Sequence, residues 1–191
     1  MNERERTKDG RSGGEGSDTY EWLQCVVAAL LVCIAAFTFF FRLIDVAGHS
    51  MEPTLQNGDK VIVSCRVSRY EPGDIVVLRK DGFKDEPIVK RIIAVGGQTV
   101  DIDFDAGVVY VDGKALDEPY IYEPTRRAID FTEPVTVPDG CVFVMGDNRN
   151  NSQDSRLSLI GCVDTRYIIG KVVFRVLPLS AVGAIYGAKE G

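Results

Sequence analysis

The sequence predicts a mainly β protein, in which a partly closed antiparallel β domain follows one N-terminal transmembrane helix. Three observations lead to this fold class. Residues 22–41 carry no charged side chain, and short runs rich in β-branched residues recur between turn signals in the rest of the chain. No segment after residue 45 keeps the apolar period of a long helix.

The first 42 residues are predicted to form a tail and a membrane span. Residues 1–19 are rich in Gly, Ser and mixed charges, which cannot bury enough apolar surface to fold, so we expect a disordered tail. Residues 20–42 contain an uncharged stretch long enough to cross about 30 Å of hydrocarbon. Tyr20, Trp22 and Arg42 lie at its ends, where interfacial anchors are expected.

Two other interpretations of this segment remain open. A cleaved secretory signal usually has an apolar region of about 7–15 residues, which is shorter than this one. A helix in the core of a soluble protein is rarely apolar on all sides. For a membrane span, the four basic residues among the first eleven positions favour a cytoplasmic N-terminus, because only Arg42 and Lys60 follow within the next twenty or so residues. Residues 43–191 then lie outside the cytoplasm.

The domain after the helix is predicted to be built from short strands. Asp112-Gly113 follows a V-V-Y-V run and is typical of a tight hairpin turn. Other Gly- and Pro-containing pairs separate the remaining runs, and residues 150–160 are polar enough to form a loop. The predicted strands are Val61–Val63, Ile75–Leu78, Ile88–Val95, Val100–Phe104, Val108–Val111, Cys141–Met145 and Lys171–Val176.

Composition excludes several classes of function. The formal net charge is −6, so the chain has no basic surface typical of nucleic-acid binding. It contains a single histidine and no C-x-x-C pair, so a zinc site is not expected. Outside the apolar segment, Cys65, Cys141 and Cys162 allow at most one disulfide, for which Cys141–Cys162 is a candidate by spacing alone.

Counting the possible bases points to a lysine. His49 adjoins Ser50, and neighbours in extended chain point to opposite faces, which disfavours a Ser-His-Asp triad. Burial disfavours the charged form of lysine and can make it a base. Lys90 lies in the apolar run P-I-V-K-R-I-I-A-V, with Arg91 on the opposite face of the strand. Lys171 is the other lysine in an apolar stretch, and an edge-strand lysine that blocks aggregation is the alternative for Lys90.

Two further segments carry candidate functional residues. Ser50 precedes an irregular stretch that contains Pro53, so it is either an exposed nucleophile or an ordinary turn serine. The polar segment Met145–Arg156 follows an apolar strand, which suggests either a solvated loop or one made rigid by ion pairs. Its charged side chains are Asp147, Arg149, Asp154 and Arg156.

Taken in order, these segments resemble the signature boxes of the type I signal peptidases, in the Gram-positive form. S-M-E-P-T-L (Ser50–Leu55) resembles the nucleophile box, and K-R-I-I-A-V-G-G (Lys90–Gly97) resembles the general-base box. G-D-N-R-N-N-S-Q-D-S-R (Gly146–Arg156) resembles the last box, and G-D-I-V-V-L (Gly73–Leu78) resembles the strand between them. The resemblance covers residues 20–178.

The resemblance implies a membrane-bound Ser-Lys serine peptidase that removes signal peptides from secreted preproteins. It implies a plasma-membrane enzyme that works as a monomer, with a lipid bilayer and preproteins as partners and with no metal, cofactor or nucleic acid. Ser50 would be the nucleophile, Lys90 the general base and Ser152 the residue that orients the lysine. The remaining candidates, for site support and the substrate groove, are Gly48, Arg91, Asp147, Arg149, Asp154, Arg156, Met51 and Pro53.

One departure from the family and two rival interpretations remain. Some members carry a serine at the position of Gly48 that helps to bind the oxyanion, so here backbone N–H groups, including that of Ser50, must do so. One rival is a different Ser-Lys peptidase, such as a self-cleaving repressor domain. The other is an anchored, non-catalytic β module that binds extended peptides. A large separation between Ser50 Oγ and the Lys90 amine would favour the module.

Overall fold

The computed structural model describes residues 15–80, 82–83 and 86–185. It contains one helix that is long and apolar enough to cross a membrane, α1 (Glu15–Phe40), whose apolar window has no buried residue among those described. The helix begins before the predicted residue 20, because extending a helix requires no new nucleus, so residues 15–19 are not disordered. Residues 1–14 of the predicted tail lie outside the described residues.

The helix also ends earlier than predicted. Phe41 and Arg42 belong to β1 (Phe41–Asp45), where they pair with Ser64 and Val63 of β2 (Lys60–Ser64). Cross-strand hydrogen bonding thus decides the conformation of residues that composition alone assigns to the apolar helix. The described chain divides into two compact units, one that ends at Phe39 and one that begins at Phe40.

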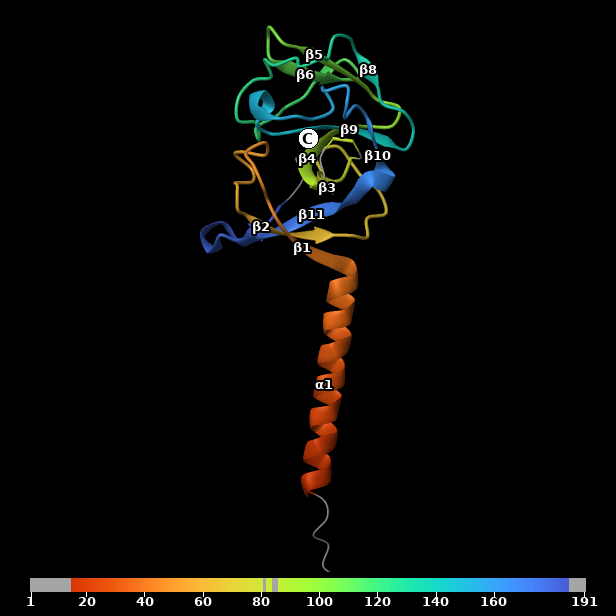
Figure 1. Cartoon of the computed structure of the whole chain (residues 1–191), viewed down its shortest axis with the longest axis vertical. Coiled ribbons are helices and arrows are strands. Elements are labelled where there is room, and N and C mark those ends of the chain that lie inside the picture. Colours follow the sequence, from red (N-terminus) through yellow and green to blue (C-terminus); the bar gives the residue numbers. More distant parts are fainter. Residues whose placement is uncertain (1–14, 81, 84–85, 186–191) are drawn as a thin grey trace, which may run out of the picture. The chain divides into compact units, whose positions relative to one another are not determined.

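The second unit is mainly β, as predicted (Figure 1). Its larger sheet is antiparallel, with the order β1-β2-β11-β3-β4-β9-β10 and with β12 paired to β11. The remaining strands of this sheet are β3 (Ile75–Leu78), β4 (Ile88–Val95), β9 (Cys141–Met145), β10 (Val163–Asp164), β11 (Ile168–Leu177) and β12 (Gly183–Ala184).

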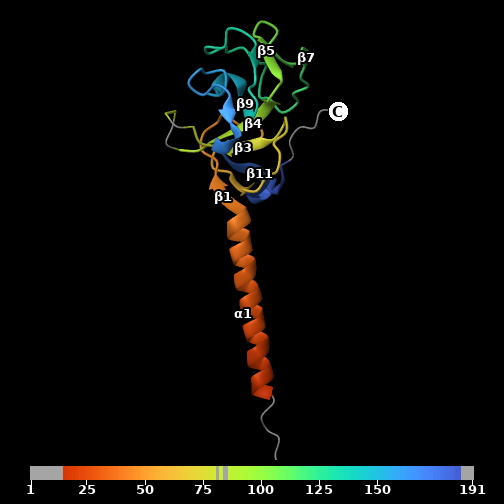
Figure 2. The ribbon, with the colours of Figure 1, turned by 90° about the vertical axis from the view of Figure 1, so that its right-hand side faces the viewer.

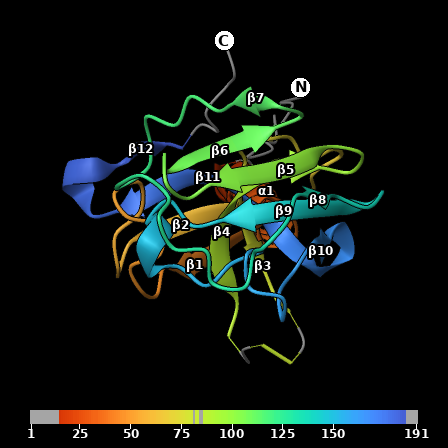
Figure 3. The ribbon, with the colours of Figure 1, turned by 90° about the horizontal axis from the view of Figure 1, so that it is seen from above.

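A second, four-stranded antiparallel sheet has the order β7-β6-β5-β8. It lies at the end of the domain away from β1 in two perpendicular views (Figures 1 and 2), and its strands run side by side when seen from above (Figure 3). Its strands are β5 (Thr99–Asp103), β6 (Val108–Val111), β7 (Lys114–Ala115) and β8 (Val135–Thr136).

All seven predicted strands are present, and the strands missed are short or adjoin the helix. The bounds of β3, β4, β6 and β9 match the predicted ranges. A two-residue strand such as β7 has no periodicity for a pattern to detect. The predicted turn between β6 and β7 is confirmed, because Asp112 and Gly113 have φ values of 51° and 77° and Val111 pairs with Lys114.

The core lies on both faces of the larger sheet, and β4 runs through its middle. Ile93 and Ala94 of β4 pack with β5, β6, Phe131 and Phe143, whereas Val89 packs with Met51 and residues of β2 and β3 on another face. Six consecutive residues of β4 are buried. A strand buried on both faces holds its side chains rigidly, so β4 is well suited to position reactive groups.

The cysteines of the domain are free thiols, so the candidate Cys141–Cys162 disulfide is not formed. Both side chains pack against the cluster that contains Phe131 and Phe143. Burial, followed by the nearby Cys141, raises the pKa of Cys162.

Candidate active site

The Ser50 hydroxyl and the Lys90 amine, forty residues apart in the chain, meet in the structure. Lys90 Nζ lies 2.7 Å from Ser50 Oγ and donates a hydrogen bond to Val89 O at 3.0 Å. The lysine is 3 % exposed. The other lysine in an apolar stretch, Lys171, instead forms an ion pair with Asp74 at 2.5 Å and is 31 % exposed. Among these two lysines, only Lys90 is placed to exchange a proton with a serine.

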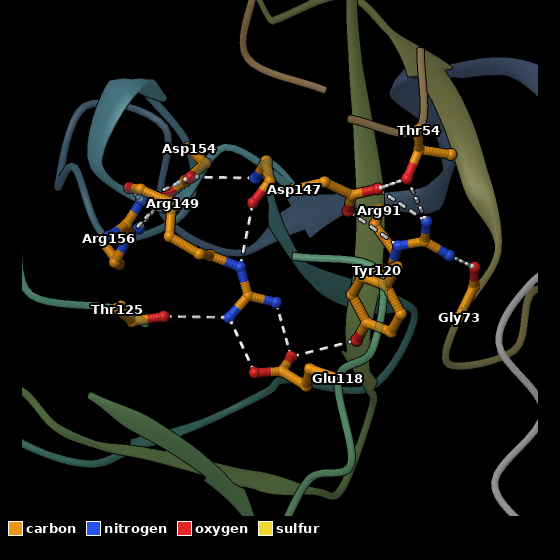
Figure 4. Close-up of polar contacts among 11 residues, drawn as sticks. Thr54, Gly73, Arg91, Glu118, Tyr120, Thr125, Asp147, Arg149, Asp154 and Arg156 are labelled. Atoms are coloured by element: carbon orange, nitrogen blue, oxygen red, sulfur yellow. Dashed lines mark hydrogen bonds and ion pairs between the residues drawn. The ribbon is translucent and has the colours of Figure 1, made fainter. Parts of the chain in front are cut away.

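The strand β4 directs Lys90 and Arg91 to different partners, as its alternation predicts. Arg91 forms a bidentate, buried ion pair with Asp147, with Nε–Oδ1 at 2.8 Å and Nη2–Oδ2 at 2.7 Å (Figure 4). Its Nη1 donates to Gly73 O at 2.9 Å, and its guanidinium lies 3.9 Å from the centroid of the Tyr120 ring. Thr54 Oγ1 donates to Asp147 Oδ2 at 2.5 Å, which ties the segment after Ser50 to the same carboxylate.

A second buried arginine, Arg149, is held by a residue outside the polar segment. Its Nη1 and Nη2 donate to the two carboxylate oxygens of Glu118 at 3.0 and 2.5 Å, and Nη1 donates to Thr125 Oγ1 at 3.1 Å (Figure 4). Burial alone lowers the pKa of Arg149, but the Glu118 charge and hydrogen bonds outweigh it and raise the pKa. Burial, followed by the Glu118 charge, raises the pKa of Tyr120.

The third ion pair, Asp154 with Arg156, is fully buried and joins two residues of the same polar segment. Arg156 Nε and Nη2 donate to the Asp154 carboxylate at 2.8 and 2.9 Å, and Gly146 N donates to its Oδ2 at 3.0 Å. Burial favours a raised pKa for Asp154, but the hydrogen bonds and charge of Arg156 hold the pKa below its ordinary value. The segment is therefore a rigid, ion-paired loop and not a solvated one.

The loop contacts the backbone of the serine segment directly. Asn148 N donates to Ser50 O at 3.0 Å, and Asn148 Nδ2 donates to His49 O at 3.1 Å. A Cβ atom on Gly146 would lie 2.4 Å from Ser50 O and 2.3 Å from Ser152 Oγ, so only glycine permits this approach. The loop thus positions the backbone that carries the Ser50 hydroxyl.

The backbone conformation at residue 48 explains why a glycine stands where some family members carry a serine. Gly48 has a φ of 90°, a region that favours glycine, and its N–H donates to Asn57 Oδ1 at 2.9 Å. That N–H is therefore not available to a ligand. The N–H of Ser50, by contrast, has no hydrogen-bond acceptor among the described residues.

A pocket of about 330 Å³ opens beside the serine and the lysine. Ser152 lines it and is 2 % exposed, but within the described part of the chain its hydroxyl has no hydrogen-bond partner, so the expected bond to Lys90 is not formed here.

The two residues expected in the substrate groove do not line this pocket. Met51 is 1 % exposed because it packs in the core, and Pro53 is exposed at the surface. No metal-like cluster of His, Cys, Asp and Glu occurs among the described residues.

Comparison with known proteins places these features in a family. The model of the family described as "Signal peptidase, peptidase S26" matches residues 19–177. The chain belongs to this family. The signal peptidase match includes the serine segment, the lysine strand and the ion-paired loop in one continuous region, which covers most of the chain.

Individual signal peptidases are similar over nearly their whole length. Signal peptidase I S of Bacillus subtilis is 39 % identical, over 84 % of this chain and 90 % of the relative. Signal peptidase I of Bacillus licheniformis is 34 % identical, over 90 % and 96 % of the two chains. A probable signal peptidase I-1 of Synechocystis is 37 % identical, over 86 % of each chain.

The sequence predicted which segments form this site more accurately than it predicted which charged side chains form ion pairs. We predicted ion pairs within the polar segment, and Asp154 with Arg156 is such a pair, but Asp147 and Arg149 pair outside the segment. Pattern reasoning missed Glu118 and Tyr120, which lie in an irregular segment with no local signal. The unusual burial of Arg149 is what requires an acidic partner.

Proposed function

We propose that the chain is a membrane-bound serine endopeptidase that removes N-terminal signal peptides from secreted preproteins, with Ser50 as nucleophile and Lys90 as general base. The separation of 2.7 Å between Ser50 Oγ and Lys90 Nζ carries this proposal, because it is the contact that proton transfer requires. Relatives named signal peptidase I, similar over most of their length, support the choice of substrate. A non-catalytic peptide-binding module has no need for such a contact.

In the proposed first step, the lone pair of neutral Lys90 accepts the Ser50 proton as Oγ attacks the scissile carbonyl carbon. Burial of the amine favours the neutral form that this step needs. The tetrahedral intermediate then collapses to an acyl-enzyme, and the lysine returns the proton to the amine of the departing mature protein. In the second step, Lys90 takes a proton from water, whose oxygen attacks the acyl carbon. The lysine then returns this proton to Ser50 Oγ as the acyl–oxygen bond breaks, and the signal peptide leaves as a carboxylate.

The backbone around Ser50 and the edge of β4 supply the binding groups in this proposal. The Ser50 N–H binds the oxyanion, since it has no other acceptor in the described structure. Ile88 and Val89 of β4 pair with β3 on one side, whereas the pairing with β9 on the other side stops at Arg91. The signal peptide therefore extends along the edge of β4 that β9 leaves open. Ser152 lines the same pocket as Lys90, and in the proposed mechanism its hydroxyl, which has no partner in the described structure, turns toward the amine and orients it. The three buried ion pairs keep the loop in place. The enzyme works without a metal or cofactor.

The proposed location is the plasma membrane, with α1 as a single span, a cytoplasmic N-terminus and residues 43–191 as an extracytoplasmic peptidase domain. The length of α1 and the absence of burial along its described apolar window support a span over a core helix. The family model matches the chain from residue 19 onward, so it includes the apolar helix together with the proposed catalytic segments. This supports a membrane anchor as part of the enzyme. We propose that the enzyme works as a monomer.

The decisive experiment incubates the purified full chain with a preprotein and determines the N-terminal sequence of the product. The wild type should release the mature protein, whereas Ser50→Ala and Lys90→Met should each lower the rate by at least about 100-fold. Lys90→Arg should also be inactive, because arginine does not lose its proton. Cleavage by the wild type should fall on acidification as the amine becomes protonated.

Matched variants separate loss of chemistry from loss of folding. Ser68→Ala and Lys114→Met make the same chemical changes at exposed positions and should cleave normally. The thermal unfolding midpoint of Lys90→Met should stay near that of the wild type, because methionine fills a similar buried volume without a charge. Full activity in Lys90→Met would remove the lysine from the mechanism.

A further inference from the structure

The described residues that line the pocket beside Ser50 are of two chemical kinds. Phe83, Ile88 and Val89 present apolar groups, whereas Arg127, Asn151, Ser152 and Gln153 present polar ones. In the proposed function the signal peptide extends along Ile88 and Val89, so the apolar group suits uncharged side chains of the residues before the scissile bond. The polar group includes a guanidinium for which the mechanism has no role.

The charge of this pocket differs from that of the whole protein. The chain has a net charge of −6, yet the described lining residues include His49, Lys90 and Arg127 and no Asp or Glu. His49 Nδ1 lies 2.8 Å from Glu52 Oε1, so its partner is a carboxylate outside the lining. The proposed mechanism needs Lys90 to be neutral. Arg127 therefore supplies the permanent positive charge of the pocket.

The backbone of Arg127 is held firmly against the polar loop. Its N–H donates to Asn150 Oδ1 at 3.0 Å, and its carbonyl accepts from Arg156 Nη1 at 2.7 Å. Nearby, Asp130 accepts from Ser158, and Ile129 adopts a φ of 64°, which a β-branched residue keeps only where its surroundings impose it. The backbone that carries the Arg127 side chain is thus tied to the loop that contacts Ser50.

The guanidinium itself remains accessible. Arg127 is exposed, and its Nη1 makes one long contact, 3.4 Å to Asn150 O. No carboxylate of the described chain lies within ion-pair distance of it. An exposed guanidinium on a firmly held backbone, without an acidic partner among the described residues, is suited to bind a carboxylate of a ligand.

We propose that Arg127 is a specificity-determining residue that favours preproteins with Asp or Glu in the first residues after the scissile bond. This inference rests on the proposed function. Residues before the bond lie along the apolar group in the proposed function, which favours uncharged side chains, so they offer no partner for a guanidinium. Residues after the bond belong to the mature protein and can carry the carboxylate.

The test uses two preproteins that differ only in the two residues after the cut, Glu-Glu in one and Lys-Lys in the other. At low salt, the wild type should cleave the acidic substrate with a kcat/KM about two- to fivefold higher, the range expected of an exposed ion pair. Arg127→Gln should remove this preference, and Arg127→Glu should reverse it. High salt should weaken the wild-type preference, because it screens exposed charges.

Arg126→Gln is the matched control. It removes the same charge one residue away, but the Arg126 guanidinium donates to the carbonyl oxygens of Phe104 and Asp105 and does not line the pocket. This variant should keep the wild-type preference. An equal loss of preference in Arg126→Gln would overturn the inference in favour of a general charge effect.

The outcomes also separate this inference from the proposed function. Ser50-dependent cleavage with the same preference in Arg127→Gln as in the wild type would refute the role of Arg127 and leave the peptidase intact. Failure of the wild type to cleave either preprotein, or equal cleavage by Ser50→Ala, would refute the proposed function and this inference with it.

Discussion

At the scale of single residues, two glycines decide how the backbone approaches the reactive hydroxyl. Gly48 adopts a left-handed conformation, and a Cβ added there would meet no atom within 4 Å, so its requirement is one of backbone angle. Gly146 has an ordinary φ but no room for a Cβ, so its requirement is one of space. Glycine is thus required near Ser50 for two different reasons, a backbone angle at residue 48 and a lack of space at residue 146.

Gly146→Ala should displace the polar loop from the serine segment. Its Cβ would overlap Ser50 O and Ser152 Oγ, and relieving such an overlap costs about 1–3 kcal/mol of unfolding free energy. A shift of about 1 Å at Ser50 should lower kcat roughly 100-fold. Gly183→Ala is the control, since nothing lies within 4 Å of a Cβ there, and it should change stability by no more than about 0.5 kcal/mol. Equal effects of the two changes on kcat would contradict this explanation.

At the scale of elements, the site is the junction of a buried strand and an ion-paired loop. The strand β4 presents Lys90 toward Ser50 and Arg91 toward Asp147, so it links the reactive amine to the loop through adjacent residues. The loop completes its own structure with the Asp154–Arg156 pair. Because these ion pairs are buried, removing one partner leaves an uncompensated charge, at a cost of about 3–5 kcal/mol.

The Asp154 carboxylate should make the stability of the loop depend on pH. The folded state holds its pKa below the unfolded value of about 3.9, so its contribution is present above pH 4 and is lost as the pH falls through the folded pKa. Unfolding free energy, measured from pH 7 to pH 2, should therefore fall in acid. Asp154→Asn should be less stable at pH 7 and lose less stability below pH 4.

Asp139→Asn removes a carboxylate at an exposed position and should keep the acid dependence of the wild type. The explanation fails if Asp154→Asn and the wild type lose stability in parallel down to pH 2.

At the scale of the whole molecule, the apolar helix and the β domain are separate compact units. The three core clusters of the domain contain only residues between Ile44 and Ile185. The domain therefore has a hydrophobic core of its own. This division matches the proposed roles of an anchor and a peptidase.

A chain that begins at Phe40 should keep the fold and lose the anchor. It retains β1 and its pairing with β2, so its thermal unfolding midpoint should be close to that of the domain in the full chain. In a flotation experiment with lipid vesicles, the full chain should float with the vesicles and the shortened chain should stay in the soluble fraction. Flotation of the shortened chain would place the membrane attachment in the domain and not in α1.

Much of the fold and the site was predictable from the sequence because it depends on local pattern. Residue composition determined the apolar helix, and β-branched runs between turns determined the main strands with nearly correct bounds. The order of the motifs was enough to select Ser50 and Lys90 as candidates. Residues 41–42 were misassigned, because apolar composition does not distinguish the end of a helix from a strand that pairs with β2.

Only the tertiary structure decided which charges meet. Lys90 lies against a hydroxyl and Lys171 against a carboxylate, although both occupy apolar strands. Asp147 pairs with Arg91 of β4, and Arg149 pairs with Glu118 in an irregular segment. The physical reason is that an ion pair depends on strand register and loop path across the whole domain, whereas a helix or strand depends mainly on residues adjacent in the chain.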